Sequence, residues 1–333
     1  MRVVTRALLA GALLAGCRGV PPKSAGPPGP ADDMRRDIAH LASRALGGRA
    51  TGAAGNDSAA AFVARRYGAL GLGGAFGTRS CDTPAPCPAA YFQRFRVRSA
   101  RAQNVGAVLP GTDPALRGQF VVVGAHYDHI GRTGVGALDP EVGHLLHPGA
   151  DDNASGTAAV FALAQRLRAR PPRRSVLFVN FGAEEVGLVG SHVFVNDPPV
   201  PLDLVVAMIN LDMVGRLRGG RLSVLGASTP ELRALVDSAG AVAHVRLAVF
   251  GASMGNSDHA SFAAKRIPAV HLFTGYHGDY HRVTDTADRV DAAGLVRVVD
   301  LAECLTRGVA DRPGRLGARR AVSDRGAVAA RTR

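Results

Sequence analysis

Residues 120–125 read Phe120-Val121-Val122-Val123-Gly124-Ala125, and the chain continues as His126-Tyr127-Asp128-His129. A continuous apolar run of this length, rich in β-branched residues, is typical of a strand that is covered on both faces of a sheet. The polar residues that follow the run fall where such a strand would end. This stretch therefore predicts a buried strand that delivers polar side chains to one edge of a sheet.

The same alternation of strands and helices continues on both sides of this stretch. It predicts an α/β fold, a three-layer α/β/α sandwich around a mainly parallel mixed sheet. A chain of 333 residues, 47% of them apolar, suits a single domain of this type. The expected helices are 33–46, 58–70 (capped by Asn56-Asp57-Ser58), 155–168, 188–196, 230–239, 257–264 and 292–306, and the expected strands are 91–97, 104–109, 120–125, 175–181, 204–211, 222–225, 245–250 and 269–273.

Residues 1–17 have the features of a lipoprotein-type signal peptide. Arg2 and Arg6 precede the apolar run 7–15, which is too short to span a bilayer as a helix of the mature protein. The run ends in Leu14-Ala15-Gly16-Cys17, which resembles a bacterial lipobox with Cys17 as the lipid anchor in the membrane. An ordinary secretory signal is the alternative. Both predict export, to the cell envelope (periplasmic or outer membrane) or into the medium.

Two further segments flank the domain, which is expected at residues 33–311. Residues 18–32 are rich in proline, glycine and small residues, which predicts a flexible linker. Residues 312–333 carry seven arginines and one aspartate, which predicts a disordered basic tail and places much of the formal charge of +13 outside the domain. Contact of the tail with anionic lipid or nucleic acid is the alternative. Because the tail has no aromatic residues to stack on bases, we expect no nucleic-acid partner.

The cysteines are interpreted through the expected export, which permits disulfides. Cys81 and Cys87 bracket a proline-containing stretch and are candidates for one bridge. Cys304 falls in a helical pattern, so we expect a buried apolar thiol there.

Acidic residues and histidines cluster where the expected strands run out into loops. His126 follows one strand, Glu184-Glu185 another and Asp212 a third, while Asp152 precedes a helix and Tyr280-His281 lies in a late loop. Carboxylates and imidazoles are the ligand types that suit zinc. Two zinc ions that share a bridging carboxylate can activate water for peptide hydrolysis, with a further carboxylate left to carry the proton. The sequence offers candidates for each of these roles.

Six sequence blocks resemble those of the two-zinc aminopeptidases, the family of secreted bacterial leucyl aminopeptidases whose relatives include glutamate carboxypeptidase, glutaminyl cyclase and the transferrin receptor. The blocks occur in the family's order over about residues 41–309. They are His126-Tyr127-Asp128, residues 149–156, residues 183–188 with Gly190-Ser191, Asn210-Leu211-Asp212-Met213, Ser257-Asp258-His259 and Tyr280-His281. The resemblance implies the zinc-exopeptidase fold, which is phosphorylase/hydrolase-like, with a single catalytic domain, and it implies cleavage of the N-terminal residue from peptides with a free N-terminus.

The same resemblance implies a role for each matching residue. Two zinc ions would be bound, and Glu184 would be the general base that takes a proton from the attacking water. Tyr280 would donate a hydrogen bond to the oxyanion, and Asp128 would orient the imidazole of His126. The implied ligands are His126 and Asp212 on one ion, Glu185 and His281 on the other, and Asp152 on both.

Several residues and alternatives stay open at this point. We expect His129, His144, His147 and His277 to be rim or loop residues rather than ligands, and Asp151, Asp258 and His259 to be either functional or simply solvated. Carboxypeptidase or glutaminyl-cyclase-like activity on the same fold is an alternative, as is a non-catalytic surface binding module. The chain has no tryptophan, which counts against a cyclase pocket. We expect a monomer.

Overall fold

The computed structural model describes residues 29–77, 88–132, 135–139, 144–252 and 256–317. The expected signal peptide, the Cys81–Cys87 pair and the tail beyond residue 317 lie outside the described residues. Within the described part, no helix combines the length and the hydrophobicity needed to cross a bilayer. The helices are α1 (Pro30–Leu41), α2 (Ala54–Ala69), α3 (Gly156–Ala169), α4 (Val189–Asn196), α5 (Pro230–Val242), α6 (His259–Ala264) and α7 (Ala292–Ala310), and the strands are β1 (Gly73–Gly74), β2 (Phe92–Val97), β3 (Ala100–Leu109), β4 (Phe120–His126), β5 (Ser175–Phe181), β6 (Val205–Leu211), β7 (Arg221–Leu225), β8 (Arg246–Phe250) and β9 (Ala269–Phe273).

The strands form one nine-stranded mixed sheet in the order β1-β3-β5-β4-β6-β9-β7-β8, with β2 paired to β3. The central strands β5, β4, β6 and β9 are parallel. Toward the edges, β3 runs antiparallel to β5, and β7 runs antiparallel to β9. Strands β2 and β3 are joined by a tight turn, which forces antiparallel pairing, whereas the central strands are joined by helices. Four parallel strands therefore form the centre of the sheet, and a further parallel pair, β7 and β8, lies at one edge.

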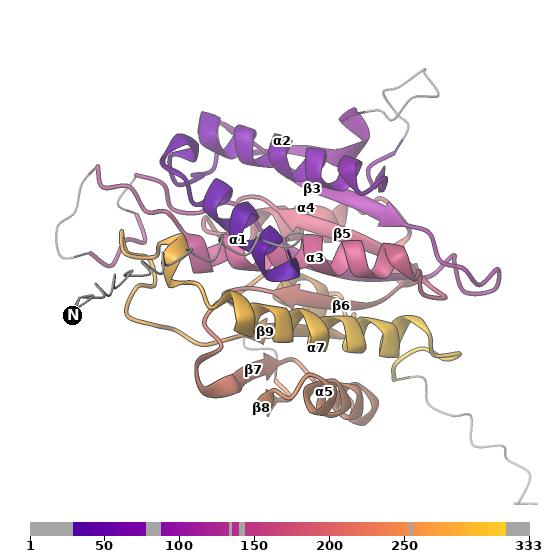
Figure 1. Cartoon of the computed structure of the whole chain (residues 1–333). Coiled ribbons are helices and arrows are strands. Elements are labelled where there is room, and N and C mark those ends of the chain that lie inside the picture. The colour runs from indigo at the N-terminus through magenta and orange to yellow at the C-terminus, as the bar shows by residue number, and fades with distance from the viewer. Residues whose placement is uncertain (1–28, 78–87, 133–134, 140–143, 253–255, 318–333) are drawn as a thin grey trace, which may run out of the picture.

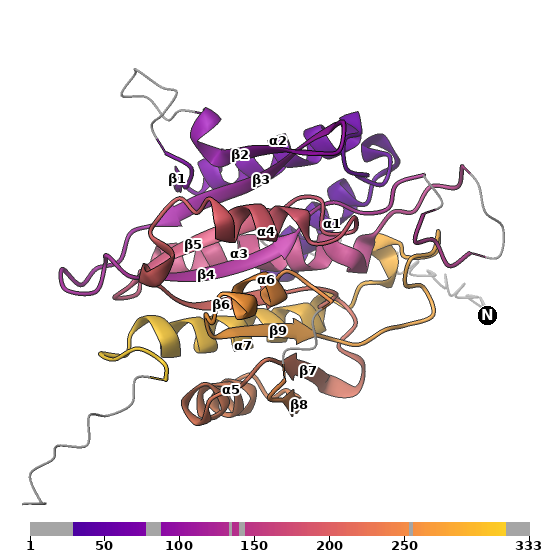
Figure 2. The ribbon, with the colours of Figure 1, turned by 180° about the vertical axis from the view of Figure 1, so that it is seen from behind.

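Helices cover both faces of this sheet, so the predicted three-layer α/β/α sandwich is confirmed. Helices α1, α3 and α7 lie across one face, with α2 and α5 towards its two edges (Figure 1). The shorter helices α4 and α6 lie on the opposite face (Figure 2). Because both faces are covered, the central strands read as continuous apolar runs rather than as an alternation.

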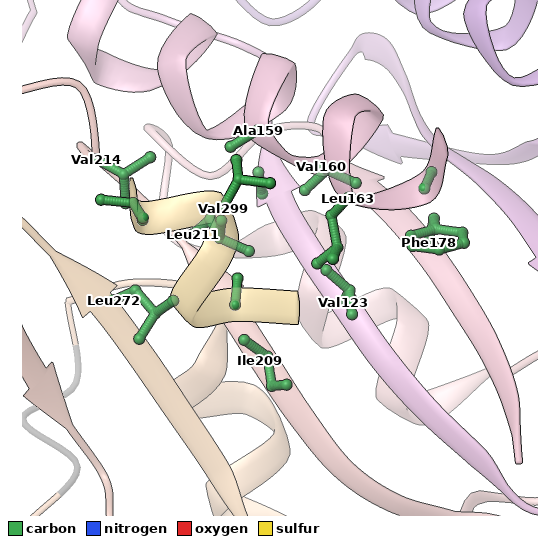
Figure 3. Packing of buried hydrophobic residues seen from close by; sticks show 14 of the residues in the cluster. Val123, Ala159, Val160, Leu163, Phe178, Ile209, Leu211, Val214, Leu272 and Val299 are labelled. Carbon is green, nitrogen blue, oxygen red and sulfur yellow. The ribbon is translucent and has the colours of Figure 1, made fainter. Parts of the chain in front are cut away.

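The core divides into two clusters, one on each face of the sheet. Successive side chains of a strand point to opposite faces, so Val121 and Val123 of β4 belong to the larger cluster and Val122 belongs to the smaller one. In the larger cluster, Val123 lies beside Leu163 of α3, and Val299 of α7 lies near Leu211 of β6 (Figure 3). The smaller cluster includes, among others, Phe194 of α4 and Phe262 of α6.

The predicted boundaries of the first two helices are wrong. The helix expected at 33–46 begins at Pro30, inside the expected linker, and ends at Leu41. The predicted caps Asn56-Asp57-Ser58 lie inside α2, which begins at Ala54. The buried Arg49 donates to the carbonyl oxygen of Leu41, and the Asn56 amide donates to that of Arg49 at 3.0 Å. The start of α1 is capped locally, because the main-chain nitrogen of Gly29 donates to Asp32 Oδ2 at 3.2 Å, whereas the Asn56 side chain makes a tertiary hydrogen bond instead of capping a helix.

Candidate metal centre

The four parallel central strands all deliver site residues at their carboxyl ends. His126 is the last residue of β4, Asp212 follows β6 directly, and Glu184-Glu185 follow β5. The loop after β9 carries Tyr280-His281, and Asp152 lies in the irregular helical turn before α3. The carboxyl ends of parallel strands meet at one edge of the sheet, where ligands of α/β proteins usually bind. The structure therefore brings all the sequence-predicted site residues to one place.

Asp152 connects two sets of potential metal ligands. Its Oδ1 lies 3.3 Å from His126 Nε2, which in turn lies 3.3 Å from Asp212 Oδ1. Its Oδ2 lies 3.0 Å from His281 Nε2, which lies 3.2 Å from Glu185 Oε2. We call the His126–Asp152–Asp212 set the first half of the centre and the His281–Asp152–Glu185 set its second half. The Asp152 carboxylate belongs to both halves.

The chemistry of both halves fits zinc. All five residues are largely buried, and the donor atoms within each half lie within 4.8 Å of one another. Buried carboxylates in such numbers repel one another unless a cation or a proton offsets their charge. Within the described residues, the close contacts of His281 Nε2 with Asp152 and Glu185 lack hydrogen-bond geometry, as expected of a nitrogen that binds an ion together with those oxygens. Imidazole nitrogens and carboxylate oxygens are the donors that zinc prefers.

Asp128 contacts more than the sequence suggested. Its Oδ1 lies 3.7 Å from His126 Nδ1, while its main-chain oxygen lies closer to that nitrogen, at 3.2 Å. Its carboxylate accepts hydrogen bonds from the main-chain nitrogens of Glu184 at 3.1 Å and Glu185 at 3.4 Å. The buried Asp128 therefore ties the end of β4 to the loop that carries both glutamates.

Glu184 is half-buried and lies between the two halves. Its carboxylate comes within 4.8 Å of donor atoms of both His126 and Glu185, and it lines the central cavity. Burial raises the pKa of Glu184 well above its usual value, and the neighbouring charges of Asp212 and Glu185 add to that effect, while His126 opposes it. A carboxylate with a raised pKa accepts a proton readily, which is the property a general base needs.

Tyr280 borders a cavity of about 290 Å³ that opens onto both halves. Its ring stacks on the imidazole of His281, with centroids 3.9 Å apart and planes 25° apart. Burial raises the pKa of the Tyr280 hydroxyl, so it stays protonated and can donate a hydrogen bond. Apolar and aromatic side chains border the rest of the cavity, among them Met213, Leu225, Phe250, Phe273 and Tyr276.

His129 lies in a loop, as the prediction allowed, but it is buried rather than at the rim of the site. Its side chain is 1% exposed, and its Nδ1 lies 2.7 Å from Glu185 Oε1. His147 and His277 are also buried, with Nε2 of each paired to a carboxylate, Asp139 at 2.8 Å and Asp151 at 3.0 Å respectively. Spacing along the chain could not reveal these pairs because each partner is supplied by a loop. His144 is exposed, in agreement with the prediction.

The three residues left open by the sequence lie outside the donor groups found among the described residues. Asp151 accepts a hydrogen bond from the main chain of Gly215 at 2.6 Å, which indicates a structural role. Asp258 and His259 are fully buried at the start of α6, and within the described chain their side-chain oxygens and nitrogens have no hydrogen-bond partner.

Three buried residues that support the centre were missed in the sequence. Arg49 donates to the carbonyl oxygens of Tyr127, Pro148 and Gly149 at 2.7 to 2.8 Å. Arg216 pairs with Asp285, whose Oδ2 accepts from the main-chain nitrogens of Asp151 at 2.9 Å and Asp152 at 3.1 Å. Asp285 follows His281 by four residues, a proximity that could have flagged it. Nothing in the periodicity marks a buried arginine.

Comparisons with known proteins agree with this geometry. Leupeptin-inactivating enzyme 1 from Streptomyces exfoliatus is 30% identical over 200 residues, which cover 59% of this chain and 41% of that protein. The probable lipoprotein aminopeptidase LpqL from Mycobacterium tuberculosis is 28% identical over 239 residues, which cover 61% of this chain and 43% of that protein. The matches thus span less than half the length of these two relatives. The solved structure of BSAP, a zinc aminopeptidase from Bacillus subtilis, shares the fold with a TM-score of 0.65 at 18% identity, over 85% of this chain and 95% of that one.

The family assignment depends on a direct match to a family model. The model of peptidase family M28 matches residues 104–305, which is more than half of the chain. The matched region begins in β3 and includes every residue placed above in the two halves of the centre. The resemblance drawn from the six sequence blocks is thereby confirmed at the level of the family, and this chain belongs to peptidase family M28.

Proposed function

We propose that this chain is a zinc-dependent aminopeptidase that binds two zinc ions and cleaves the N-terminal residue from peptides. Membership of a peptidase family supports the peptide substrate. LpqL and BSAP are both named as aminopeptidases, which supports the choice of the N-terminal bond. The observation that carries the proposal is the Asp152 carboxylate, whose two oxygens face different sets of ligands at 3.3 and 3.0 Å. A carboxylate placed in this way suits two neighbouring ions.

Each proposed ligand has a place in this arrangement. His126 and Asp212 would hold one ion, Glu185 and His281 the other, and Asp152 both. When bound, a zinc pair polarises the scissile carbonyl and makes water a stronger nucleophile at neutral pH. Ser257 donates to Asp212 Oδ2 at 2.7 Å, which leaves Oδ1 directed toward His126.

Glu184 is the proposed general base. Its carboxylate takes one proton from the water that attacks the carbonyl carbon and passes that proton to the nitrogen of the leaving amine as the carbon–nitrogen bond breaks. No net proton is gained or lost by Glu184 over the reaction. Asp128 holds the main chain at Glu184, which would keep the carboxylate between the two halves.

Two features would bind and orient the peptide. The Tyr280 hydroxyl would donate a hydrogen bond to the carbonyl oxygen as negative charge develops on it. The largely apolar cavity beside the centre would hold the side chain of the N-terminal residue, because it is about 290 Å³ in volume and open to both halves.

We also propose that the enzyme is exported as a monomer and held at the membrane by a lipid on Cys17. The lipobox-like sequence at residues 14–17 supports this, and LpqL is named as a lipoprotein. Residues 1–17 would be the signal, and the catalytic domain would include residues 30–316, because α1 begins at Pro30 and Leu316 belongs to the core. The expected linker at 18–32 and the expected tail at 312–333 are shortened accordingly. Radiolabelled palmitate incorporated into the wild-type chain but not into Cys17→Ser would support the anchor.

The test of the function combines activity with metal analysis. We expect the purified protein to release free amine from leucine p-nitroanilide, to lose this activity with a strong chelator and to regain it with zinc. Glu184→Gln should lower kcat on the order of 10²- to 10⁴-fold, because a positioned base contributes that much, while zinc content stays at the wild-type level. Near-normal turnover by Glu184→Gln with zinc bound would contradict the mechanism. Activity only on C-terminal bonds, or cyclisation of N-terminal glutamine, would contradict the proposed reaction.

A further inference from the structure

The buried His129 lies at the metal centre, but the mechanism proposed above gives it no role. It lies on the loop after β4, three residues beyond His126, and its ring faces the second half of the centre. Its Nδ1 approaches Glu185 Oε1 to 2.7 Å but stays 4.0 Å from the nearest Asp152 oxygen. It therefore makes one close contact, and that contact is with a proposed zinc ligand.

The distances distinguish a hydrogen bond from a shared ion. Donor atoms that bind one tetrahedral zinc at 2.0–2.2 Å lie roughly 3.3 Å apart. The contacts among the proposed ligands, at 3.0 to 3.3 Å, match that spacing. The contact between His129 and Glu185, at 2.7 Å, is shorter and has the length of a charge-assisted hydrogen bond.

The two oxygens of Glu185 consequently have different partners. Oε1 accepts the hydrogen bond from His129 Nδ1, while Oε2 lies 3.2 Å from His281 Nε2 and faces the position shared with Asp152. We propose that His129 is a positioning residue that holds Oε1 of Glu185 and thereby presents only Oε2 to the zinc ion of the second half. This inference rests on the proposed function, since it needs an ion in that half.

The ring of His129 is itself fixed in place. Its main-chain nitrogen donates to the Arg49 carbonyl oxygen at 3.3 Å, and Arg49 is fully buried. Gly149 packs against the ring so closely that a Cβ at that position would lie 2.5 Å from Cγ and Cδ2 of the imidazole. The imidazole of His281 approaches it edge-on, with centroids 5.5 Å apart. The backbone of His129 is hydrogen-bonded, and Gly149 and His281 contact its ring. The ring therefore cannot follow Glu185 if that side chain rotates, so the hydrogen bond restrains the carboxylate.

Removal of this restraint should weaken zinc binding in one half alone. Hydrogen-bonding partners of zinc ligands typically change metal affinity by roughly 10- to 100-fold when they are mutated. We therefore expect His129→Leu to lower the affinity of the second half for zinc by about 10- to 100-fold. His129→Asn should regain most of the affinity, because its amide nitrogen can occupy nearly the place of Nδ1 and donate the same bond.

The experiment isolates each half before His129 is changed. In an Asp212→Ala background only the second half remains complete, and in a His281→Ala background only the first. Zinc affinity is measured by competition with a chromophoric chelator, and the cobalt(II) absorption spectrum of each variant reports the geometry around the ion. His129→Leu should weaken binding and alter the cobalt spectrum in the Asp212→Ala background but leave both unchanged in the His281→Ala background. His192→Leu, which removes an exposed histidine, is the control for loss of an imidazole.

Three results would overturn the inference. One is unchanged zinc affinity for His129→Leu in the Asp212→Ala background. Another is an equal loss in both backgrounds, which would indicate a general structural defect. The third is a His129→Asn variant as weak as His129→Leu, which would show that the imidazole binds the ion itself. Failure of the proposed function looks different, because the wild-type protein would then bind no zinc pair at all.

Discussion

The two halves of the centre are built in different ways. In the first half, His126 is the last residue of β4 and Asp212 follows β6 directly, so the sheet itself positions both side chains. In the second half, Glu185 and His281 lie on loops beyond β5 and β9. The sheet cannot position them at that distance. Side-chain hydrogen bonds from other loops do so instead.

The supports of the second half form a connected network. His281 Nδ1 donates to the carbonyl oxygen of Gly136 at 2.8 Å, which leaves Nε2 for an ion. His129 holds Glu185, and Arg216 pairs with Asp285, which binds the main chain at Asp152. The comparison teaches that strand ends place both ligands of the first half, with added support from the Ser257 hydroxyl on Asp212, whereas the ligands of the second half depend mainly on buried polar groups far from them in sequence.

The largest expected effect comes from the residue that both halves share. Asp152→Ala should remove the bridging carboxylate, lose both zinc ions and lower kcat/KM on the order of 10³-fold or more, because the carbonyl and water lose several kcal/mol of stabilisation. Elemental analysis and leucine p-nitroanilide hydrolysis measure the two effects. Asp212→Ala should lose only one ion. If Asp152→Ala kept both ions, the two halves would be independent sites rather than one centre.

A smaller effect is expected when the ion pair of Arg216 with Asp285, which supports Asp152, is removed. Arg216 is buried, with its guanidinium 3.1 Å from Asp285 and 3.3 Å from Asp279. Arg216→Met should leave the buried Asp285 without its cation, while Asp279 keeps its pair with Arg289, and should destabilise the zinc-free protein by about 3–5 kcal/mol. Because Asp285 binds the main chain at the shared Asp152, the variant should also weaken zinc binding by roughly 10- to 100-fold. Urea denaturation in the presence of chelator and zinc competition measure the two changes.

A matched variant at Arg289 tests whether the effect of Arg216→Met comes from the burial of the arginine or only from the loss of its charge. Arg289 also pairs with Asp279, at 2.6 Å, but its side chain is 49% exposed. Because solvent screens an exposed pair, Arg289→Met should cost about 1 kcal/mol or less and leave zinc affinity unchanged. Equal losses for the two arginine variants would show that the buried network gives the second half no special support.

The same comparison explains what could be predicted from the sequence. The central strands were predictable because residues 120–125 and 175–181 are apolar runs long enough to identify a covered sheet. His126 directly follows the run 120–125, and Asp212 directly follows the strand predicted at 204–211. Matching residues in the six blocks of a known family brought in Asp152, Glu185 and His281, whose loops no periodicity could place.

The supporting residues could not be predicted in the same way. His129, Arg49 and Asp285 carry out their roles through partners that lie 56, 78 and 134 residues away in sequence. Local patterns report helix and strand periods, and these do not encode which loops meet in space. The contact between the buried His129 and Glu185 was missed for this reason, and the wrong cap assignment for Asn56 has the same origin.

The smallest expected effect concerns a buried charge beside the first half. Asp258 is fully buried, and within the described chain its carboxylate oxygens have no hydrogen-bond partner. Burial raises the pKa of Asp258 to about 7, an effect opposed by His126 and reinforced by Asp212. Between the ordinary aspartate pKa and pH 7 the folded protein therefore holds a proton that the unfolded chain has released. The stability that comes from this proton is lost as pH rises through about 7.

Asp258→Asn should accordingly remove a pH dependence rather than a fixed amount of stability. Its amide cannot ionise, so the Tm of the variant minus that of the wild type should rise by a few degrees between pH 5 and pH 8. The measurement uses zinc-free protein with chelator present, so that metal binding does not contribute to the change. A difference that is constant with pH would mean that Asp258 is ionised throughout, held by a cation or by hydrogen bonds. The first half would then depend on buried polar partners as much as the second, and the contrast between a half built by strands and a half built by loops would no longer hold.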